Sequence, residues 1–379
     1  MTGSLQTKTG RKNYYVVLNR KDENGNRKPL WINTEVPVVG NNKRKANLAL
    51  KKIISEYEEK ERLGLAEQTN ILFADYMNQW FENMKTQVQE STFESYQYAL
   101  NHIVSYFKVK GIMLRELKPE HIQKYYTDKI NGGLCGSTIQ KHHSNIHKAL
   151  NIALKYNLIP YNPADRVQLP KKQKYQAKTY NEQQIKKLIQ CARGNPIEAA
   201  VVITSYLGLR RSEVLGLKWT AVDFKANTLL IQTTVVRTKR IITKDTTKNK
   251  SSHRTLPIPA GLVKYLKDLL KRQEKNEILF GNCYNDNEWI CKKEDGTPIT
   301  PTGLSYYYKK LLKDNGLPHI RFHDLRHSTA SILINSGCEL YEIKELLGHS
   351  QIATTADIYG HLDFKAKQRM AAKINELLG

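Results

Sequence analysis

The sequence lacks long apolar runs, paired cysteines and a balance between acidic and basic residues. No apolar run approaches the roughly 20 residues that a membrane-spanning helix needs, and no apolar stretch follows the first charges as in a secretory signal. The five cysteines are an odd number and are widely scattered, which excludes a disulfide framework and disfavours a zinc site. We expect a cytoplasmic protein with reduced thiols, no metal and no membrane partner.

What the sequence has in excess is positive charge. It contains 60 Lys and Arg residues against 36 Asp and Glu, a formal net charge of +24 at pH 7. An excess of this size favours a polyanionic partner, because each cation that neutralises a phosphate releases a counterion. A protein that coats nucleic acid and an enzyme that acts on it both fit this composition.

The 379 residues exceed what one hydrophobic core usually serves, so several domains are expected. Alternating apolar residues at 14–18 and 30–34 flank an Asn-Gly pair, which predicts a β-hairpin. A helical pattern follows over 43–63, so residues 1–65 form a small basic domain of hairpin or sheet plus helix. Its basic residues fit either a sheet that reads a DNA groove or a solvated charged face.

The rest of the chain divides at a second boundary. Residues 70–158 carry four helical patterns, whose aromatic stripe is better explained as the core of an all-α bundle than as a base-stacking surface. Residues 159–174 contain two X-Pro steps and a basic run, as in a linker. The pattern of residues 175–379 predicts a mainly helical domain with a small antiparallel sheet, including strands near 228–233 and 255–258. The predicted fold class is therefore multidomain α+β.

Residues suited to phosphodiester cleavage recur along the last domain. The reaction needs a nucleophile, cations around the phosphate oxygens and an acid for the departing oxygen. Arg210 lies in Leu-Gly-Leu-Arg-Arg-Ser-Glu, and His323 and Arg326 lie in His-Asp-Leu-Arg-His, where a spacing of three puts both on one helical face. His349 follows in Leu-Gly-His-Ser, and Tyr359 in Thr-Thr-Ala-Asp-Ile-Tyr-Gly-His. Each element alone is weak, but their order and spacing together are specific.

This four-part signature resembles that of the tyrosine recombinase (phage integrase) family. The resemblance covers the catalytic domain, 175–379. By pattern, the helical region 70–158 resembles the family's core-binding, SAM-like domain, and residues 1–65 resemble the arm-binding domain of integrases from phages and conjugative transposons. The implied function is site-specific recombination, with integration and excision of a mobile element. A type IB topoisomerase-like relaxing enzyme and a non-catalytic DNA-binding protein are the alternatives.

The resemblance also implies the role of each site residue. Arg210 and Arg326 would clamp the scissile phosphate, and Tyr359 would attack it to form a 3′-phosphotyrosine. His323 and His349 would donate further hydrogen bonds, with His323 able to assist deprotonation of the tyrosine. Lys248 would be the general acid, with Lys250 as its competitor. Two acidic residues would orient the arginines and the fold: Glu213 and Asp324.

The same resemblance implies partners and excludes a cofactor. Because the covalent intermediate conserves the bond energy of the phosphodiester, no nucleotide cofactor is expected. No metal is expected either, because no carboxylate trio in the sequence is arranged for two-metal catalysis. The expected partner is double-stranded DNA at core and arm attachment sites, bound by a homotetramer on two duplexes. In that tetramer, a C-terminal helix at 363–379 would dock on a neighbouring protomer, although packing on its own domain is the alternative. A directionality factor and a host DNA-bending protein are possible further partners, in the nucleoid of a bacterial host.

Overall fold

The computed structural model describes residues 2–19, 27–62, 71–172, 178–237, 241–244, 253–285, 288–348 and Glu376. The chain divides into two compact units, Met1–Gln173 and Lys174–Gly379. Each is described by itself below. The mostly helical chain with small antiparallel sheets confirms the predicted α+β class.

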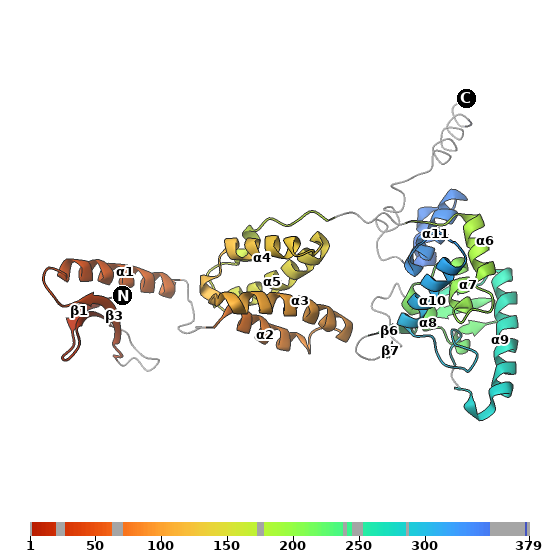
Figure 1. Cartoon of the computed structure of the whole chain (residues 1–379), viewed down its shortest axis with the longest axis horizontal. Helices are drawn as coiled ribbons and strands as arrows, with labels where there is room; N and C mark the ends of the chain where they lie inside the picture. Colours follow the sequence, from red (N-terminus) through yellow and green to blue (C-terminus); the bar gives the residue numbers. More distant parts are fainter. Residues whose placement is uncertain are drawn as a thin grey trace. The chain divides into compact units, whose positions relative to one another are not determined.

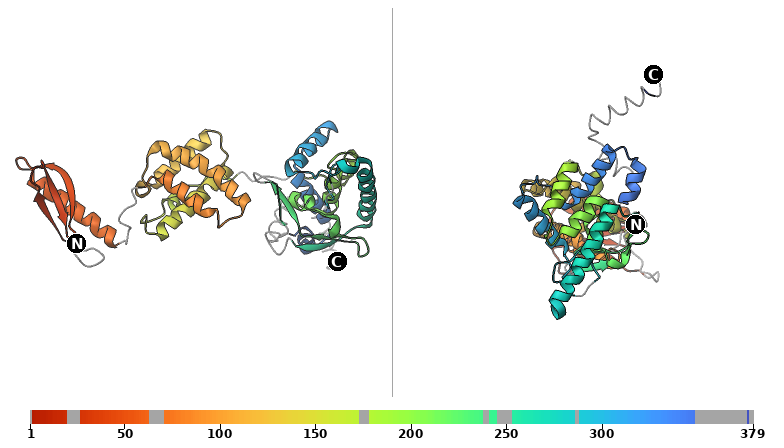
Figure 2. Two further views of the ribbon diagram at one scale, coloured as in Figure 1. Left: turned by 90° about the horizontal axis from the view of Figure 1, so that it is seen from below. Right: turned by 90° about the vertical axis from the view of Figure 1, so that its right-hand side faces the viewer.

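The chain begins with a three-stranded antiparallel sheet in the order β1-β2-β3. Its elements are β1 (Gly3–Thr7), β2 (Asn13–Leu18), β3 (Leu30–Pro37) and the following helix α1 (Lys43–Arg62). Helix α1 lies along one face of the sheet, as Figure 2 shows, and contacts all three strands. Residues of β3 are half-buried and exposed in turn, as expected for a strand with one covered face, and Val16 and Leu18 of the central strand β2 are fully buried. The sequence predicted β2, β3 and α1, but the short polar strand β1 was missed.

Residues 71–172 form an antiparallel helical bundle (Figure 1). Its elements are α2 (Phe73–Met84), α3 (Glu90–Lys110), η1 (Leu114–Glu116), α4 (Pro119–Asn131), α5 (Gly136–Lys155) and η2 (Pro163–Arg166). Pro119 occupies the first turn of α4, where its missing N–H costs nothing. The aromatic stripe of α2 is buried, with Trp80 only 2% exposed, so it belongs to the core as predicted.

The segment after η2 stays in contact with the bundle. The Gln140 side chain donates to the Pro170 carbonyl at 2.7 Å, and the Gln168 N–H donates to the side chain of Gln123 at 2.8 Å. Gly136 is required at this contact, because a Cβ there would lie 2.6 Å from the Lys171 carbonyl oxygen. Much of the predicted linker, 159–174, therefore follows the surface of the bundle.

The second unit is mainly helical and surrounds a large apolar core, with a smaller buried cluster between α11 and α12. Its helices are α6 (Glu182–Cys191), α7 (Glu198–Leu207), α8 (Arg211–Leu215), η3 (Trp219–Ala221), α9 (Ala260–Phe280), η5 (Gly281–Cys283), α10 (Pro301–Asp314), α11 (Phe322–Asn335) and α12 (Leu340–Leu347). Helix α7 contacts both α11 and α9 (Figure 1), and nearly all of its residues are buried. Its apolar sequence, Glu-Ala-Ala-Val-Val-Ile, suits a helix enclosed on all sides.

Two small antiparallel sheets complete this unit. The first has the order β4-β5-β8, and the second pairs β6 with β7. The strands are β4 (Val222–Asp223), β5 (Thr228–Ile231), β6 (Thr234–Arg237), β7 (Ile241–Lys244) and β8 (Arg254–Pro257). The predicted strands near 228–233 and 255–258 correspond to β5 and β8, which pair with Ile231 opposite Arg254. This pairing places Arg254 at the start of β8.

Candidate active site

The first candidate arginine lies at the junction between α7 and α8. Gly208 ends α7 with φ +61°, a left-handed conformation that favours glycine. Arg210 is the N-cap of α8, and the Glu213 carboxylate accepts a hydrogen bond from the Arg210 backbone N–H at 2.9 Å. The sequence Arg-Arg-Ser-Glu therefore caps its own helix, and this capping fixes the backbone of Arg210.

Glu213 holds two arginine side chains at once. Its carboxylate accepts from Arg210 Nη1 at 2.6 Å and from Arg254 Nη2 at 3.2 Å. The Glu213 side chain is only 1% exposed. Burial opposes its ionisation, but the cations Arg254 and Arg210 outweigh burial and lower the pKa of the carboxyl. Glu213 is therefore a buried anion that orients Arg210, in line with its predicted role.

The second candidate arginine, Arg326, comes from the first half of α11 and is 1% exposed. Its Nη1 donates to the Gly208 carbonyl at 2.8 Å, and its Nη2 donates to the Leu347 carbonyl at 2.5 Å. One guanidinium group thus joins the end of α7 to the end of α12. Because both ends of the fork are held by backbone, its direction is fixed.

Three arginines meet at the C-terminal end of α12. The carbonyl oxygens of Leu346, Leu347 and Gly348 accept, in order, from Arg254 Nε at 3.1 Å, Arg326 Nη2 at 2.5 Å and Arg210 Nη2 at 2.7 Å. The last carbonyls of a helix lack partners within the helix and carry its negative partial charge, so cations are favoured there. The three arginines come from β8, α11 and the start of α8 and converge on three consecutive residues.

The cluster is strongly electropositive. Two of the three guanidinium groups bind the carboxylate of Glu213, and the third is held by backbone carbonyls, which leaves a net charge of +2 among these four side chains. Burial, and after it the neighbouring Arg210, lower the pKa of Arg326 to about 9, so the charged guanidinium group is less favourable here than in water. Arg210 and Arg326 each use two of five N–H donors in the contacts above. An anion that accepted hydrogen bonds from both groups would relieve their repulsion.

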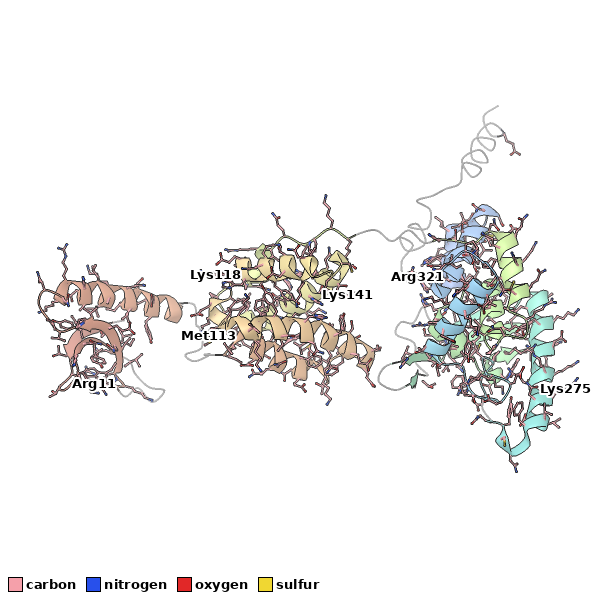
Figure 3. The ribbon with its side chains drawn as sticks, viewed as in Figure 1. Arg11, Met113, Lys118, Lys141, Lys275 and Arg321 are labelled. Atoms are coloured by element: carbon pink, nitrogen blue, oxygen red, sulfur yellow. The ribbon has the colours of Figure 1, made fainter. Side chains whose placement is uncertain are left out.

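His323 lies one helical turn before Arg326, near the start of α11, with part of its ring open to solvent. Its ring packs edge-on against that of His327, with centroids 5.1 Å apart. Partial burial, His327 and the Arg326 guanidinium lower the pKa of His323 to about 4, so its imidazole is neutral at pH 7. The nearby Asp324 accepts from the side chain of Arg321 at 2.9 Å and 3.1 Å and caps α11. Figure 3 labels Arg321 on this unit.

Comparisons with known proteins agree with this geometry. The model of the phage integrase family matches residues 178–366, and that of the integrase N-terminal SAM-like domain matches residues 72–130. A XerC-like tyrosine recombinase of Caldanaerobacter subterraneus is 30% identical over 81% of this chain and 84% of its own length. The chain belongs to this family. It is a site-specific tyrosine recombinase.

Two further comparisons extend over much of the recombinase. The ICEBs1 integrase of Bacillus subtilis is 25% identical over 90% of this chain and 92% of its own length. In fold, the recombinase is similar to the Tn1549 transposon integrase, whose structure was solved with transposon right end DNA. That similarity has a TM-score of 0.68 at 17% identity and covers 80% of this chain and all of the other.

Four predicted site residues lie outside the residues that the structure describes. They are Lys248, its competitor Lys250, His349 and Tyr359. The predicted docking helix, 363–379, is described only at Glu376. Of the predicted set, the structure brings together Arg210 and Arg326 and places His323 on the same helix as Arg326.

Sequence reasoning missed one residue of the site, Arg254. It stood in the segment predicted to hold the lysine, yet no role was given to it. The available signal was its position at the start of Arg-Thr-Leu-Pro, because successive side chains of a strand point to opposite faces of the sheet. Which helices lie over that strand depends on tertiary packing, so its contact with Glu213 could not be read from the strand alone.

Neither a metal cluster nor a membrane span is seen in the described part of the recombinase. Among these residues, no group of three or more His, Cys, Asp or Glu side chains could hold a metal ion. None of the helices found there is both long enough and apolar enough to cross a membrane.

Proposed function

We propose that this recombinase integrates and excises a mobile element, with Tyr359 as nucleophile and with Arg210 and Arg326 as the clamp on the scissile phosphate. The observation that carries this proposal is the convergence of the two arginines on adjacent carbonyls, those of Gly348 and Leu347. It gathers two guanidinium groups at Leu347 and Gly348, twelve and eleven residues before Tyr359 in the sequence. Guanidinium groups suit this task, because they stay charged and donate paired hydrogen bonds to phosphate.

The proposed reaction balances without a cofactor. The phenol oxygen of Tyr359 forms a bond to phosphorus, the bond from phosphorus to the 5′ oxygen breaks, and that oxygen takes a proton from Lys248. Rejoining reverses these steps with the 5′-hydroxyl of the partner strand, so each phosphodiester that is broken is replaced. A free tyrosine has a pKa near 10 and is a poor nucleophile at neutral pH, so neighbouring cations are needed.

We assign His323 to assist deprotonation of Tyr359 by accepting a hydrogen bond from its phenol. The lowered pKa of His323 keeps its imidazole ring neutral at pH 7, and a neutral ring has one nitrogen free to accept a hydrogen bond. His349 directly follows Gly348, whose carbonyl accepts from Arg210. We assign it a supporting hydrogen bond to the phosphate.

Action on a mobile element is supported by the extent of the match to the ICEBs1 integrase, which spans 90% of the chain. We assign residues 1–65 to arm-site DNA, residues 70–158 to core-site DNA and residues 175–379 to catalysis, with residues 159–172 packed on the core-site domain. The active assembly is a homotetramer on two duplexes, tied together by the helix at 363–379. It acts on the bacterial nucleoid in the cytoplasm, with a directionality factor and a host DNA-bending protein as accessory partners.

The test is capture of the covalent intermediate. A suicide substrate with a nick beside the cleavage site releases its 5′-hydroxyl end, so the protein–DNA adduct accumulates. The wild-type protein should give a protease-sensitive adduct, and Tyr359→Phe should give none. Tyr341→Phe is the matched control, because Tyr341 is a 60% exposed tyrosine on α12 and should leave the adduct unchanged. An adduct formed by Tyr359→Phe would refute the assignment of the nucleophile.

A further inference from the structure

The contacts of Arg254 set it apart from the other arginines of the cluster. Its side chain is 10% exposed, against 32% for that of Arg210. Its Nη1 and Nη2 atoms donate to the two carboxylate oxygens of Glu213 at 3.4 Å and 3.2 Å, and its Nε donates to the Leu346 carbonyl at 3.1 Å. All three nitrogens of this guanidinium group therefore donate to protein atoms, and little of the side chain can reach a DNA phosphate.

We propose that Arg254 is a positioning residue, which acts through Glu213 and the end of α12 to aim Arg210 at the phosphate. This inference rests on the role of Arg210 proposed above. Both oxygens of the Glu213 carboxylate are shared, because Oε1 accepts from both arginine side chains and Oε2 accepts from Arg254 and from the Arg210 backbone. Arg254 thus sets the plane of the carboxylate that sets the direction of Arg210.

The second link runs through α12. Arg254 holds the Leu346 carbonyl, and the next two carbonyls accept from Arg326 and Arg210. A shift of this helix end would therefore move the acceptors of both clamp arginines together. Arg254 starts β8, six residues after Lys248 in the sequence. The strand that follows the proposed general acid is thus joined, through one side chain, to the clamp.

The decisive measurement is the single-turnover rate of cleavage at saturating DNA, together with the Kd for the core site. Arg254→Gln should lower the rate at least 10-fold and change the Kd less than threefold. In an Arg210→Ala background, the same change should lower the rate only two- to threefold further, because the link to Arg210 is gone and only the link through α12 to Arg326 remains. Arg254→Lys keeps the charge but cannot donate to Glu213 and Leu346 together, so it should lose at least fivefold.

Arg272→Gln is the matched control for stability. Arg272 forms an ion pair with the nearly buried Glu198 at 3.1 Å, in the same unit but apart from the cluster. This variant should have a Tm lowered about as much as that of Arg254→Gln, yet cleave at the wild-type rate. Wild-type cleavage by Arg254→Gln and Arg254→Lys, or equal loss in Arg272→Gln, would overturn the inference. So would a further 10-fold loss in the double variant, which would indicate direct action on DNA. Normal cleavage by Arg210→Ala would instead refute the proposed clamp.

Discussion

Gly208 and Leu347 approach so closely that a Cβ at position 208 would lie 2.4 Å from the Leu347 Cδ2 atom. The Gly208 backbone is also left-handed, with φ +61°, and its carbonyl accepts from Arg326. The ends of α7 and α12 can therefore meet around Arg326 only because position 208 has no side chain. One glycine thus links the packing of two helices to the geometry of the site.

Gly208→Ala should destabilise the protein by about 3 kcal/mol, the sum of left-handed strain and overpacking, and should abolish cleavage. Gly194→Ala is the matched control, because Gly194 has φ +72° and open space around it. It should cost only about 1 kcal/mol, the backbone strain alone, and retain cleavage. Urea unfolding and the suicide-substrate assay measure both effects. Equal stability of the two variants would contradict the close contact.

Arg210→Ala should lower the cleavage rate about 10² to 10³-fold, the usual effect of removing one donor to a transition-state oxygen. The Kd for core-site DNA should change little, because one phosphate contact among many contributes little to affinity. Lys275→Ala removes the same charge from the exposed side of α9 (Figure 3) and should cleave normally. Parallel loss of binding and cleavage in Arg210→Ala would show that Arg210 is a binding residue only.

Stability should fall as the pH falls from 6.5 towards 4, because of His142 in the helical bundle. Burial, His102 and Lys129 lower the pKa of His142 to about 4, and its ring is 1% exposed. The unfolded chain binds this proton near pH 6.5 and the folded chain does not, so the stabilisation is present above pH 6.5 and is lost on acidification. Between pH 7 and 5 the loss should be ~2 kcal/mol.

The comparison with His142→Gln isolates this effect. Glutamine can still accept the hydrogen bond that joins His142 Nδ1 to the Tyr125 hydroxyl at 2.9 Å, but it does not titrate. The free energy of unfolding of the variant should therefore depend less on pH between 5 and 7. An unchanged pH dependence would mean that other groups cause the acid sensitivity.

Binding of arm-site DNA should depend on the basic residues between β1 and β2. Lys8, Arg11 and Lys12 are exposed there, and Lys8 Nζ lies 5.6 Å from the centre of the Trp31 ring. Replacing all three cations with Ala should reduce the slope of log K against log salt concentration by about 3, since each phosphate contact contributes about 0.9. Core-site binding should keep its slope. An unchanged arm-site slope would remove this surface from the arm interface.

Local elements of the fold and the two clamp arginines could be predicted from the sequence, but the tertiary contacts that join them could not. Helix α1 and strands β2, β5 and β8 follow from local periodicity, and so they were predicted within a few residues of their ends. Strand β1 was missed because its sequence, Gly-Ser-Leu-Gln-Thr, is polar and gains its stability from pairing with β2.

The site shows the same division. Arg210 and Arg326 were found because their types and spacing form a recognisable signature. The role of Arg254 depends on contacts of β8 with α8 and α12, which are far apart in the sequence. Spacing along the chain carries no information about such a contact, so only the folded structure could reveal it.

The anchoring of three guanidinium groups on backbone carbonyls has a thermodynamic consequence for the protein without DNA. The free-energy cost of bringing these cations together arises when the chain folds, so it does not add to the barrier of strand cleavage. The repulsion among these cations opposes folding of the free protein, and their hydrogen bonds to Glu213 and to the carbonyls of α12 offset it. In the proposed function, the scissile phosphate of the DNA is the counterion of this cluster. Any oxyanion able to enter the cluster should therefore raise the melting temperature of the protein without DNA.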